Sequence, residues 1–555
     1  MKQLIRKLAL QNAIRYEGKA NPGAVIGHIL SKDPSLKEKA KEITTEIMEI
    51  IKEVNSMCLD DQKKELEKSA PELLKEKKKV KEEKKLKLKN VKGRVVMRFE
   101  PSPSGPLHIG HAYVLGLNSE LVKEYGGRLI LRIADTNPEK IYEPAYKLIP
   151  EDAKWVTKDN VSEVLVQSDR LDIYYRYMKR LLEIEKAYVC TCDPESFRGL
   201  INDKKACPCR SLLKEEQISR WDKMFKGYKQ GEAVVRIKTD VQHKNPAMRD
   251  FPVFRINESK HPRQGKKYRV WPLMNMAVTV DDIESGVTHI IRAKDHYDNA
   301  LRQKFIYEYL DKKFPETIFV GRINFEGMPV SCSKTRPKIE DGTYSGWDDI
   351  RLPFLMALKR RGYQPEALMK YAVDVGITLT DKTVAIDEFF KNINAFNKEV
   401  IDAESFRYFF IWNPKKITIE GAPSQEIELD LHPDNKKGGR KFKVKDVFYV
   451  TEDDYTNLKD GNLYRLMDCL NFVKKGNKLV FDSLDYDKFK EKGKGIIHWL
   501  AEENIKINVR MPDNKIIEGL AEKGIDKVKV GKVVQLERLG FCRKDKDKDF
   551  WFGHK

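Results

Sequence analysis

Two histidines, His108 and His111, stand one helical turn apart in the sequence His-Ile-Gly-His, directly before an amphipathic stretch. Unpaired N–H groups at a helix N-terminus, together with two imidazoles, can hydrogen-bond phosphate or the bridging oxygen of a triphosphate. These four letters alone are weak evidence, because short motifs recur by chance and histidine pairs are often structural or metal-bound. The pattern predicts nucleotide chemistry only if a strand, a loop and a helix surround it.

The flanking residues predict those elements. Residues 95–99 form an apolar run, residues 101–105 a Pro/Ser/Gly loop, and apolar positions then recur at helical spacing up to Gly126-Gly127, where an αL cap would end the helix. A second apolar run at 129–133 completes a βαβ unit. Open α/β sheets bind ligands at the carboxyl ends of their strands. We therefore predict a Rossmann-like nucleotide-binding domain in an α/β multidomain chain.

Composition points to a polyanionic partner. With 555 residues, the chain is too long for one core, and three or four domains are expected. A net charge of +20 and a pI of about 9.2 favour nucleic acid over a membrane. The sequence contains no apolar run of 18 residues and no signal-peptide pattern, so we expect a cytoplasmic protein with no membrane partner.

Four of the eight cysteines form a cluster: Cys190, Cys192, Cys207 and Cys209. Two close pairs of thiolates separated by a short excursion are typical of a tetrahedral structural Zn²⁺ site with no open position for catalysis. Four free thiols or a redox pair is the alternative in a reducing compartment. The other four cysteines are too scattered to add a ligand.

Longer segments resemble the class I aminoacyl-tRNA synthetases of the glutamyl/glutaminyl group, and most of all the archaeal type of glutamyl-tRNA synthetase. They are residues 98–105 (RFEPSPSG), 131–138 (LRIADTNP), 286–295 (GVTHIIRAKD) and 344–353 (YSGWDDIRLP). The resemblance covers most of the chain from about residue 94. It implies that ATP, with Mg²⁺, activates glutamate as an adenylate, which then passes to the terminal adenosine 2′-hydroxyl of tRNA(Glu). Whether tRNA(Gln) is also charged stays open.

Three other functions remain as alternatives: a glutaminyl-tRNA synthetase, a catalytically silent tRNA-binding relative, and a small-molecule nucleotidyltransferase. An acid at the Ser102 place, which is typical of glutaminyl enzymes, would repel a second substrate carboxylate, and here the residue is neutral. Glutamate is therefore favoured. A nucleotidyltransferase would need neither the cysteine insertion nor the C-terminal strands.

The resemblance assigns an ATP site with two parts. The loop Val330 to Thr335 aligns with the family's mobile triphosphate loop, whose lysine neutralises charge on the leaving pyrophosphate. Cys332 stands in the place of the key lysine and Lys334 follows two residues later, so either Lys334 takes over or backbone and hydroxyl donors serve instead. A basic surface loop without phosphate contact is the alternative. The predicted catalytic residues are His108, His111 and Lys334, and the predicted ATP-binding residues are Pro101, Ser102, Pro103, Ser104, Gly105, His108, Ile109, Gly110, His111, Ser331, Ser333 and Lys334.

Amino-acid selection follows from charge. A glutamate has two carboxylates and one ammonium, and arginine suits carboxylates by its bidentate geometry. Arg98 and Arg292 are the candidates, with structural salt bridges as the alternative for each. Asp135 is the candidate ammonium acceptor, but Ala134 stands where the family commonly has an acid. The predicted amino-acid-binding residues are Arg98, Ser102, Asp135, Asn275 and Arg292.

We expect four parts in this chain. Residues 1–93 would form a helical extension with a lysine-rich hinge, and residues 94–340 the catalytic domain, with a zinc-bearing acceptor-stem insertion at about 172–268. Helical periodicity indicates a connecting domain at 341–413, and alternating short strands at 414–555 resemble anticodon-binding antiparallel β-barrels. Arg465 and Arg543 are candidates for tRNA binding, with purely structural roles as the alternative. We expect a monomer.

Overall fold

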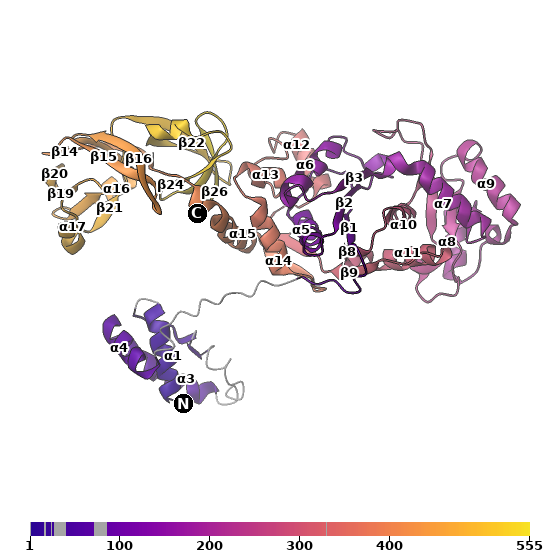
Figure 1. Cartoon of the computed structure of the whole chain (residues 1–555), viewed down its shortest axis with the longest axis horizontal. Helices are drawn as coiled ribbons and strands as arrows, with labels where there is room; N and C mark the ends of the chain where they lie inside the picture. The colour runs from indigo at the N-terminus through magenta and orange to yellow at the C-terminus, as the bar shows by residue number, and fades with distance from the viewer. Residues whose placement is uncertain (1, 16–17, 24, 27–39, 71–85, 329) are drawn as a thin grey trace. The chain divides into compact units, whose positions relative to one another are not determined.

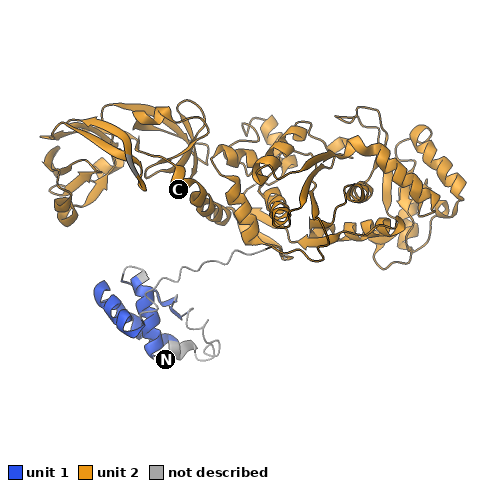
Figure 2. Cartoon of the chain, in the orientation of Figure 1, with its two compact units in different colours: residues 1–83 blue, residues 84–555 orange. Residues whose placement is uncertain are grey.

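The structure is a computed structural model that describes residues 2–15, 18–23, 25–26, 40–70, 86–328 and 330–555. The chain divides into two compact units, residues 1–83 and 84–555 (Figure 2). The first unit packs α1 (Lys2–Arg15) against α3 (Ala40–Ser56) and α4 (Leu59–Ser69). Ile47, Ile51 and Val54 of α3 are buried in its core, and the described part of this unit is helical, as expected.

The first unit ends about ten residues before the expected boundary. Residues 86–93 belong to the larger unit, where the Leu88 N–H donates to the Tyr125 hydroxyl (3.0 Å) and the Lys89 carbonyl lies 2.9 Å from His289 Nε2. Most of the predicted lysine-rich hinge, residues 71–85, lies outside the described residues.

The predicted βαβ unit is present. Strands β1 (Val96–Phe99), β2 (Arg128–Ile133) and β3 (Glu163–Val166) form a parallel sheet in that order, and α5 (Ile109–Glu124) joins the first two (Figure 1). Gly126 follows α5 with φ +58°, the left-handed conformation that ends the helix. Helix α6 (Ala145–Thr157) packs against α5.

A second parallel pair completes this part of the chain. Strand β8 (His289–Ala293) pairs with β9 (Glu316–Val320) and lies beside β1, where the Thr288 N–H donates to the Val96 carbonyl (2.9 Å). Helices α10 (Met274–Glu284) and α11 (Tyr297–Tyr309) flank β8 in the sequence. The carboxyl ends of β1, β2 and β8 therefore meet near the start of α5.

The insertion has a sheet and a core of its own. After α7 (Leu171–Glu183), strands β4 (Ala187–Cys190), β5 (Val234–Ile237), β6 (Pro252–Ile256) and β7 (Val270–Pro272) form an antiparallel sheet in chain order. Helices α8 (Pro194–Asn202) and α9 (Lys214–Lys226) lie between β4 and β5. Tyr174, Trp221 and Phe254 are buried together in its core.

Most of the elements between β9 and the C-terminal strands are helices. They are α12 (Cys332–Glu340), α13 (Leu355–Arg360), α14 (Pro365–Val375) and α15 (Ile386–Ile401), and strand β10 (Ile323–Glu326) pairs with β11 (Lys382–Ala385). Helix α14 crosses α5 closely at Gly116, where an added Cβ would lie 2.8 Å from the Ala372 Cβ. The prediction of a loop at 330–335 is wrong in part, because α12 begins at Cys332.

The C-terminal region is rich in β-structure and starts at Arg407, seven residues before the expected boundary. A seven-stranded sheet has the order β12 (Arg407–Tyr408), β24 (Val533–Leu536), β25 (Gly540–Lys544), β26 (Asp549–His554), β22 (Asn504–Arg510), β23 (Ile516–Glu522) and β13 (Phe410–Trp412). Only Phe409 separates β12 from β13, yet they occupy the two ends of this order, so the sheet curves into a near-barrel.

A six-stranded sheet has the order β17 (Val447–Thr451), β14 (Pro414–Glu420), β20 (Lys478–Ser483), β19 (Asn471–Lys475), β18 (Leu463–Leu466) and β21 (Gly495–Ile497). A two-stranded ribbon pairs β15 (Gln425–His432) with β16 (Asn435–Val444), and short helices α16 (Glu452–Thr456) and α17 (Tyr486–Lys492) join the strands. Among the described residues, we find no helix long and apolar enough to cross a membrane.

Candidate active site

His108 and His111 close the N-terminus of α5 in a reciprocal capping box. His108 Nδ1 accepts from the backbone N–H groups of Gly110 (3.1 Å) and His111 (3.3 Å), and the His108 N–H donates to His111 Nδ1 (3.4 Å). The two rings stack with centroids 3.7 Å apart. The sequence thus folds both imidazoles against one helix end, where backbone N–H groups favour an anion.

The two imidazoles are neutral near pH 7. Burial lowers the pKa of His108 well below its ordinary value, as does the neighbouring ring, and burial lowers the pKa of His111 to about 4. Each Nδ1 accepts a backbone N–H, so the hydrogen-bond network assigns the ring proton to Nε2 in both. The pair can therefore offer two neutral N–H donors to a phosphate.

Cys332 packs beneath the loop that precedes these histidines. Its side chain is buried, its Sγ lies 3.5 Å from the Pro106 carbonyl oxygen, and a Cβ added to Gly105 would lie only 2.8 Å from that Sγ. Cys332 therefore joins the first turn of α12 to the 101–105 loop and is too buried to contact a phosphate as a surface lysine would. Lys334, two residues on, is exposed.

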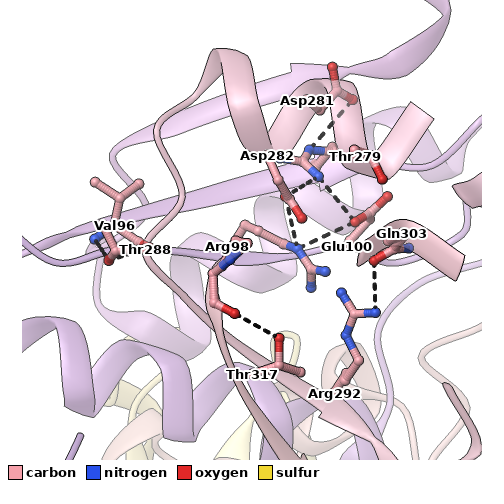
Figure 3. Close-up of polar contacts among 12 residues, drawn as sticks. Val96, Arg98, Glu100, Thr279, Asp281, Asp282, Thr288, Arg292, Gln303 and Thr317 are labelled. Atoms are coloured by element: carbon pink, nitrogen blue, oxygen red, sulfur yellow. Dashed lines mark hydrogen bonds and ion pairs between the residues drawn. The ribbon is translucent and has the colours of Figure 1, made fainter. Parts of the chain in front are cut away.

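Arg98 and Arg292 project from the ends of the neighbouring strands β1 and β8. Arg292 Nη1 donates to Gln303 Oε1 (3.0 Å), but its Nε and Nη2 atoms are buried and have no partner among the described residues. Burial, together with the charge of Arg98, lowers the pKa of Arg292 to about 10. Figure 3 shows both guanidinium groups turned toward one region beside Glu100 and Gln303. This region has unsatisfied donors and uncompensated positive charge, which suit an anion.

A buried ionic network lies behind Arg98. Arg98 Nε lies 3.4 Å from Asp282 and 3.5 Å from Glu100, so the salt-bridge alternative also holds for this residue. Arg132 is fully buried and contacts the same two acids at 2.8 and 3.3 Å, respectively. Asp281 pairs with Arg170 (2.7 Å) and with Arg132 (3.6 Å). With Arg292, four guanidinium groups face three carboxylates, an excess of one positive charge. Sequence reasoning missed this network.

Asp135 is not brought to the arginines. Its carboxylate accepts from the Ser168 hydroxyl (2.6 Å), the Ser168 N–H (2.8 Å) and the Tyr146 hydroxyl (2.6 Å), and it makes no hydrogen bond or ion pair with Arg98 or Arg292. These three donors use most of the acceptor capacity of the carboxylate, so the geometry gives no support to the predicted ammonium contact of Asp135, which stays a prediction. Ser102 is exposed, and its carbonyl accepts from the Ser104 N–H in the loop.

Asn275 does reach the arginine site. At the start of α10, its Oδ1 accepts from Gln303 Nε2 (3.3 Å), and Gln303 in turn accepts from Arg292. Asn275 therefore helps to orient Gln303 and through it the Arg292 guanidinium.

The four clustered thiols converge on one point. All four Sγ atoms of Cys190, Cys192, Cys207 and Cys209 lie within 4.8 Å of one another. The distances Cys190–Cys207 and Cys192–Cys209 are 3.9 and 3.8 Å, too long for disulfides and close to the ~3.8 Å edge of a tetrahedron with Zn–S bonds of ~2.3 Å. The donor set therefore fits Zn²⁺. Arg220 Nη1, 3.4 Å from Cys209 Sγ, would partly balance the thiolate charge.

The two predicted tRNA-binding arginines differ. Arg465 in β18 is buried, donates to Asn471 Oδ1 (2.9 Å) and lies 5.3 Å from the centre of the Tyr486 ring. Arg543 in β25 donates to the Arg360 carbonyl (3.5 Å) and pairs with Asp545 (3.7 Å). The first of these contacts joins the near-barrel to α13, which favours the structural alternative for Arg543, and its binding to tRNA stays a prediction.

A mononucleotide-binding sheet, a histidine-capped helix and an appended β-rich region are the features of a class I aminoacyl-tRNA synthetase, and sequence comparison agrees. The family profile described as the catalytic domain of class I tRNA synthetases (E and Q) matches residues 94–403, and two profiles for its anticodon-binding domains match residues 405–487 and 470–545. The chain belongs to this family, the class I tRNA synthetases for glutamate and glutamine, as the sequence predicted.

Among its relatives are the proteins named glutamate–tRNA ligase from Methanocaldococcus jannaschii (45% identical, covering 98% of both chains) and from Methanococcus maripaludis strain C7 (44% identical, covering 99% of this chain and 98% of that one). A crystal structure of a glutamate tRNA ligase from Elizabethkingia meningosepticum matches over 56% of this chain and 70% of its own, with 19% identity and a TM-score of 0.40.

Proposed function

We propose that this protein attaches glutamate to tRNA at the expense of ATP. The observation that carries the proposal is the excess positive charge at Arg98 and Arg292, with two buried, unpartnered guanidinium nitrogens on Arg292. Glutamate, with two carboxylates and one ammonium, has a net charge of −1 and balances that excess. Glutamine is net neutral and leaves it uncompensated in a buried site, which is costly. The names of the full-length relatives support the same substrate.

In the first step, the glutamate α-carboxylate attacks the α-phosphate of ATP in line. Nε2–H groups of His108 and His111, at the N-terminus of α5, are arranged to donate to the phosphate oxygens as negative charge develops. Lys334 would neutralise the leaving pyrophosphate. The 101–105 loop and residues 108–111 contain no carboxylate, so Mg²⁺ would be held mainly by the triphosphate itself, where it supplies further charge neutralisation.

In the second step, the terminal adenosine 2′-hydroxyl of tRNA(Glu) attacks the carbonyl carbon of the glutamyl-adenylate. The ester bond forms as the bond from that carbon to the phosphate oxygen breaks, and AMP leaves and takes up the hydroxyl proton. The antiparallel insertion would hold the acceptor stem, with Zn²⁺ bound by Cys190, Cys192, Cys207 and Cys209 as a structural clamp. The C-terminal sheets would act as barrels that read the anticodon, with the exposed Tyr486 ring offering an aromatic face to unstacked bases beside the buried guanidinium of Arg465. Charging of tRNA(Gln) is part of this proposal, and so is action as a monomer.

The direct test is attachment of labelled glutamate, and separately of labelled glutamine, to tRNA transcripts with glutamate and glutamine anticodons. We expect ATP-dependent attachment of glutamate, a loss of about a hundredfold or more in kcat/KM in Arg292→Gln, and no change in Arg322→Gln, an exposed arginine after β9. Attachment of glutamine instead would favour a glutaminyl enzyme. Tight tRNA binding without attachment of either amino acid would identify a catalytically silent relative.

A further inference from the structure

The proposed amino-acid site contains cations for two carboxylates and also needs an acceptor for the substrate ammonium. Ala134 stands where the resemblance places an acid, and the neighbouring Asp135 carboxylate accepts three hydrogen bonds from Ser168 and Tyr146 and makes none with Arg98 or Arg292. A buried ammonium without a carboxylate partner is strongly unfavourable. If the proposed function holds, another acid must take this role.

Glu100 lies at the right place on the sheet. It follows Arg98 by two residues, so both side chains leave the same face of β1. Ala134 follows Arg132 by two residues on the neighbouring strand, and Arg132 Nη1 contacts Glu100 at 3.3 Å. The Ala134 N–H donates to the carbonyl of Pro101, directly after Glu100 (3.1 Å). Positions 100 and 134 are therefore neighbours on one face, at the carboxyl ends of β1 and β2.

Glu100 also has free capacity. Oε1 accepts from Gln167 Nε2 (3.1 Å) and Oε2 from Arg132 Nη1 (3.3 Å), which leaves lone pairs on both oxygens because a carboxylate offers about four acceptor sites. Among the three acids of the network, Asp281 and Asp282 have side chains with no exposed surface, whereas 9% of the Glu100 side chain is exposed. In Figure 3 this carboxylate lies on the side of the network nearest Gln303.

We propose that Glu100 accepts the ammonium group of the substrate glutamate, so that the acid missing from β2 at position 134 is supplied from β1. Charge supports this assignment. Burial raises the pKa of Glu100 above its ordinary value, and a bound ammonium would stabilise the ionised carboxylate. Glu100 then has two functions, since the same carboxylate helps to hold the Arg98 guanidinium.

The experiment compares glutamate with glutarate, which has both carboxylates but no ammonium. In Glu100→Gln we expect the KM for glutamate to rise roughly ten- to a hundredfold, as expected for a lost charged hydrogen bond, while the inhibition constant of glutarate changes no more than about threefold. Glu163→Gln, at the opposite end of the same sheet where it pairs with Arg128, is the matched control and should change neither value.

A second pair of variants protects the test from a folding defect. Glu100→Ala should lose glutamate binding, and adding Ala134→Asp should recover at least a tenth of wild-type kcat/KM, because the acid returns to the same face of the sheet. The proposal is overturned if Glu100→Gln weakens glutarate as much as glutamate, or if the double variant recovers nothing. A wild-type protein that attaches no glutamate would instead overturn the proposed function.

Discussion

The imidazole rings of His108 and His111 stack with their centroids 3.7 Å apart while each Nδ1 accepts a backbone N–H at the start of α5. One set of contacts therefore caps the helix and fixes the tautomer that leaves Nε2–H free for phosphate. Stability and chemistry are coupled here, because a change that removes either ring also exposes N–H groups of the first turn.

We expect His111 to make the folded protein less stable as the pH falls from about 6.5 to about 4. The unfolded chain protonates His111 near pH 6.5, whereas the folded chain does so only near pH 4. Between these values the unfolded state binds more protons, so the free energy of unfolding falls as the pH falls through this window and is fully restored above pH 6.5.

Urea unfolding between pH 4 and pH 8 measures this slope, and His111→Gln should flatten it. Activity should stay constant from pH 8 to about pH 6 with respect to this group, since the neutral ring is the donor. A glutamylation rate in the wild type that falls tenfold between pH 7 and pH 6, with the fall abolished in His111→Gln, would contradict the assignment.

Restoring a lysine at position 332 should harm the protein. Cys332 is buried against Gly105, so Cys332→Lys would bury an ammonium and destabilise the fold by about 3 kcal/mol or more.

Lys334→Ala should lower the rate of glutamate activation roughly ten- to a hundredfold with little effect on stability, and Lys338→Ala on the same helix is its control. Thermal unfolding and ATP-dependent glutamylation separate the two effects. A faster Cys332→Lys enzyme would refute this explanation.

The sequence predicted those elements whose pattern lies within a few neighbouring residues. Apolar periodicity and the Gly126 cap define α5, and two close cysteine pairs indicate a four-thiol cluster. The C-terminal strands were expected too late because β12 and β13 are two and three residues long and show no period. Helix α12 was missed because its sequence is polar and contains Pro337.

The ionic network could not be predicted from local sequence, because Arg98 and Asp282 are 184 residues apart. For Asp135, the local sequence contained a usable signal. Successive residues at a strand end point to opposite faces, so Asp135 and Arg132 could not both face Arg98. The same alternation would have placed Glu100 beside Arg98.

The cysteine cluster should contain one Zn²⁺ per chain. Cys207→Ser removes a thiolate from the tetrahedral set, so we expect zinc content to fall well below one equivalent and kcat/KM for tRNA to fall, because the insertion loses its clamp. Cys58→Ser, at an exposed cysteine outside the cluster, should change neither value. Metal analysis of purified protein is decisive, and full activity of a zinc-free wild type would exclude a structural zinc.

Arg360 should control how firmly the near-barrel is held to the catalytic domain. Its Nη1 pairs with Asp348 (2.8 Å), in the segment after α12, and its Nε and Nη2 pair with Asp545 (2.8 and 2.7 Å), between β25 and β26. The guanidinium also stacks 3.9 Å over the Trp551 ring. The planar guanidinium group makes all of these contacts at once, which a lysine ammonium cannot do.

We expect Arg360→Lys to lower the free energy of unfolding by about 1–3 kcal/mol and to raise the KM for tRNA more than that for glutamate. Lys523→Ala, which breaks an exposed pair with Glu503, should cost no more than about 1 kcal/mol. A wild-type KM for tRNA in Arg360→Lys would show that the contacts of Arg360 do not position the near-barrel for tRNA.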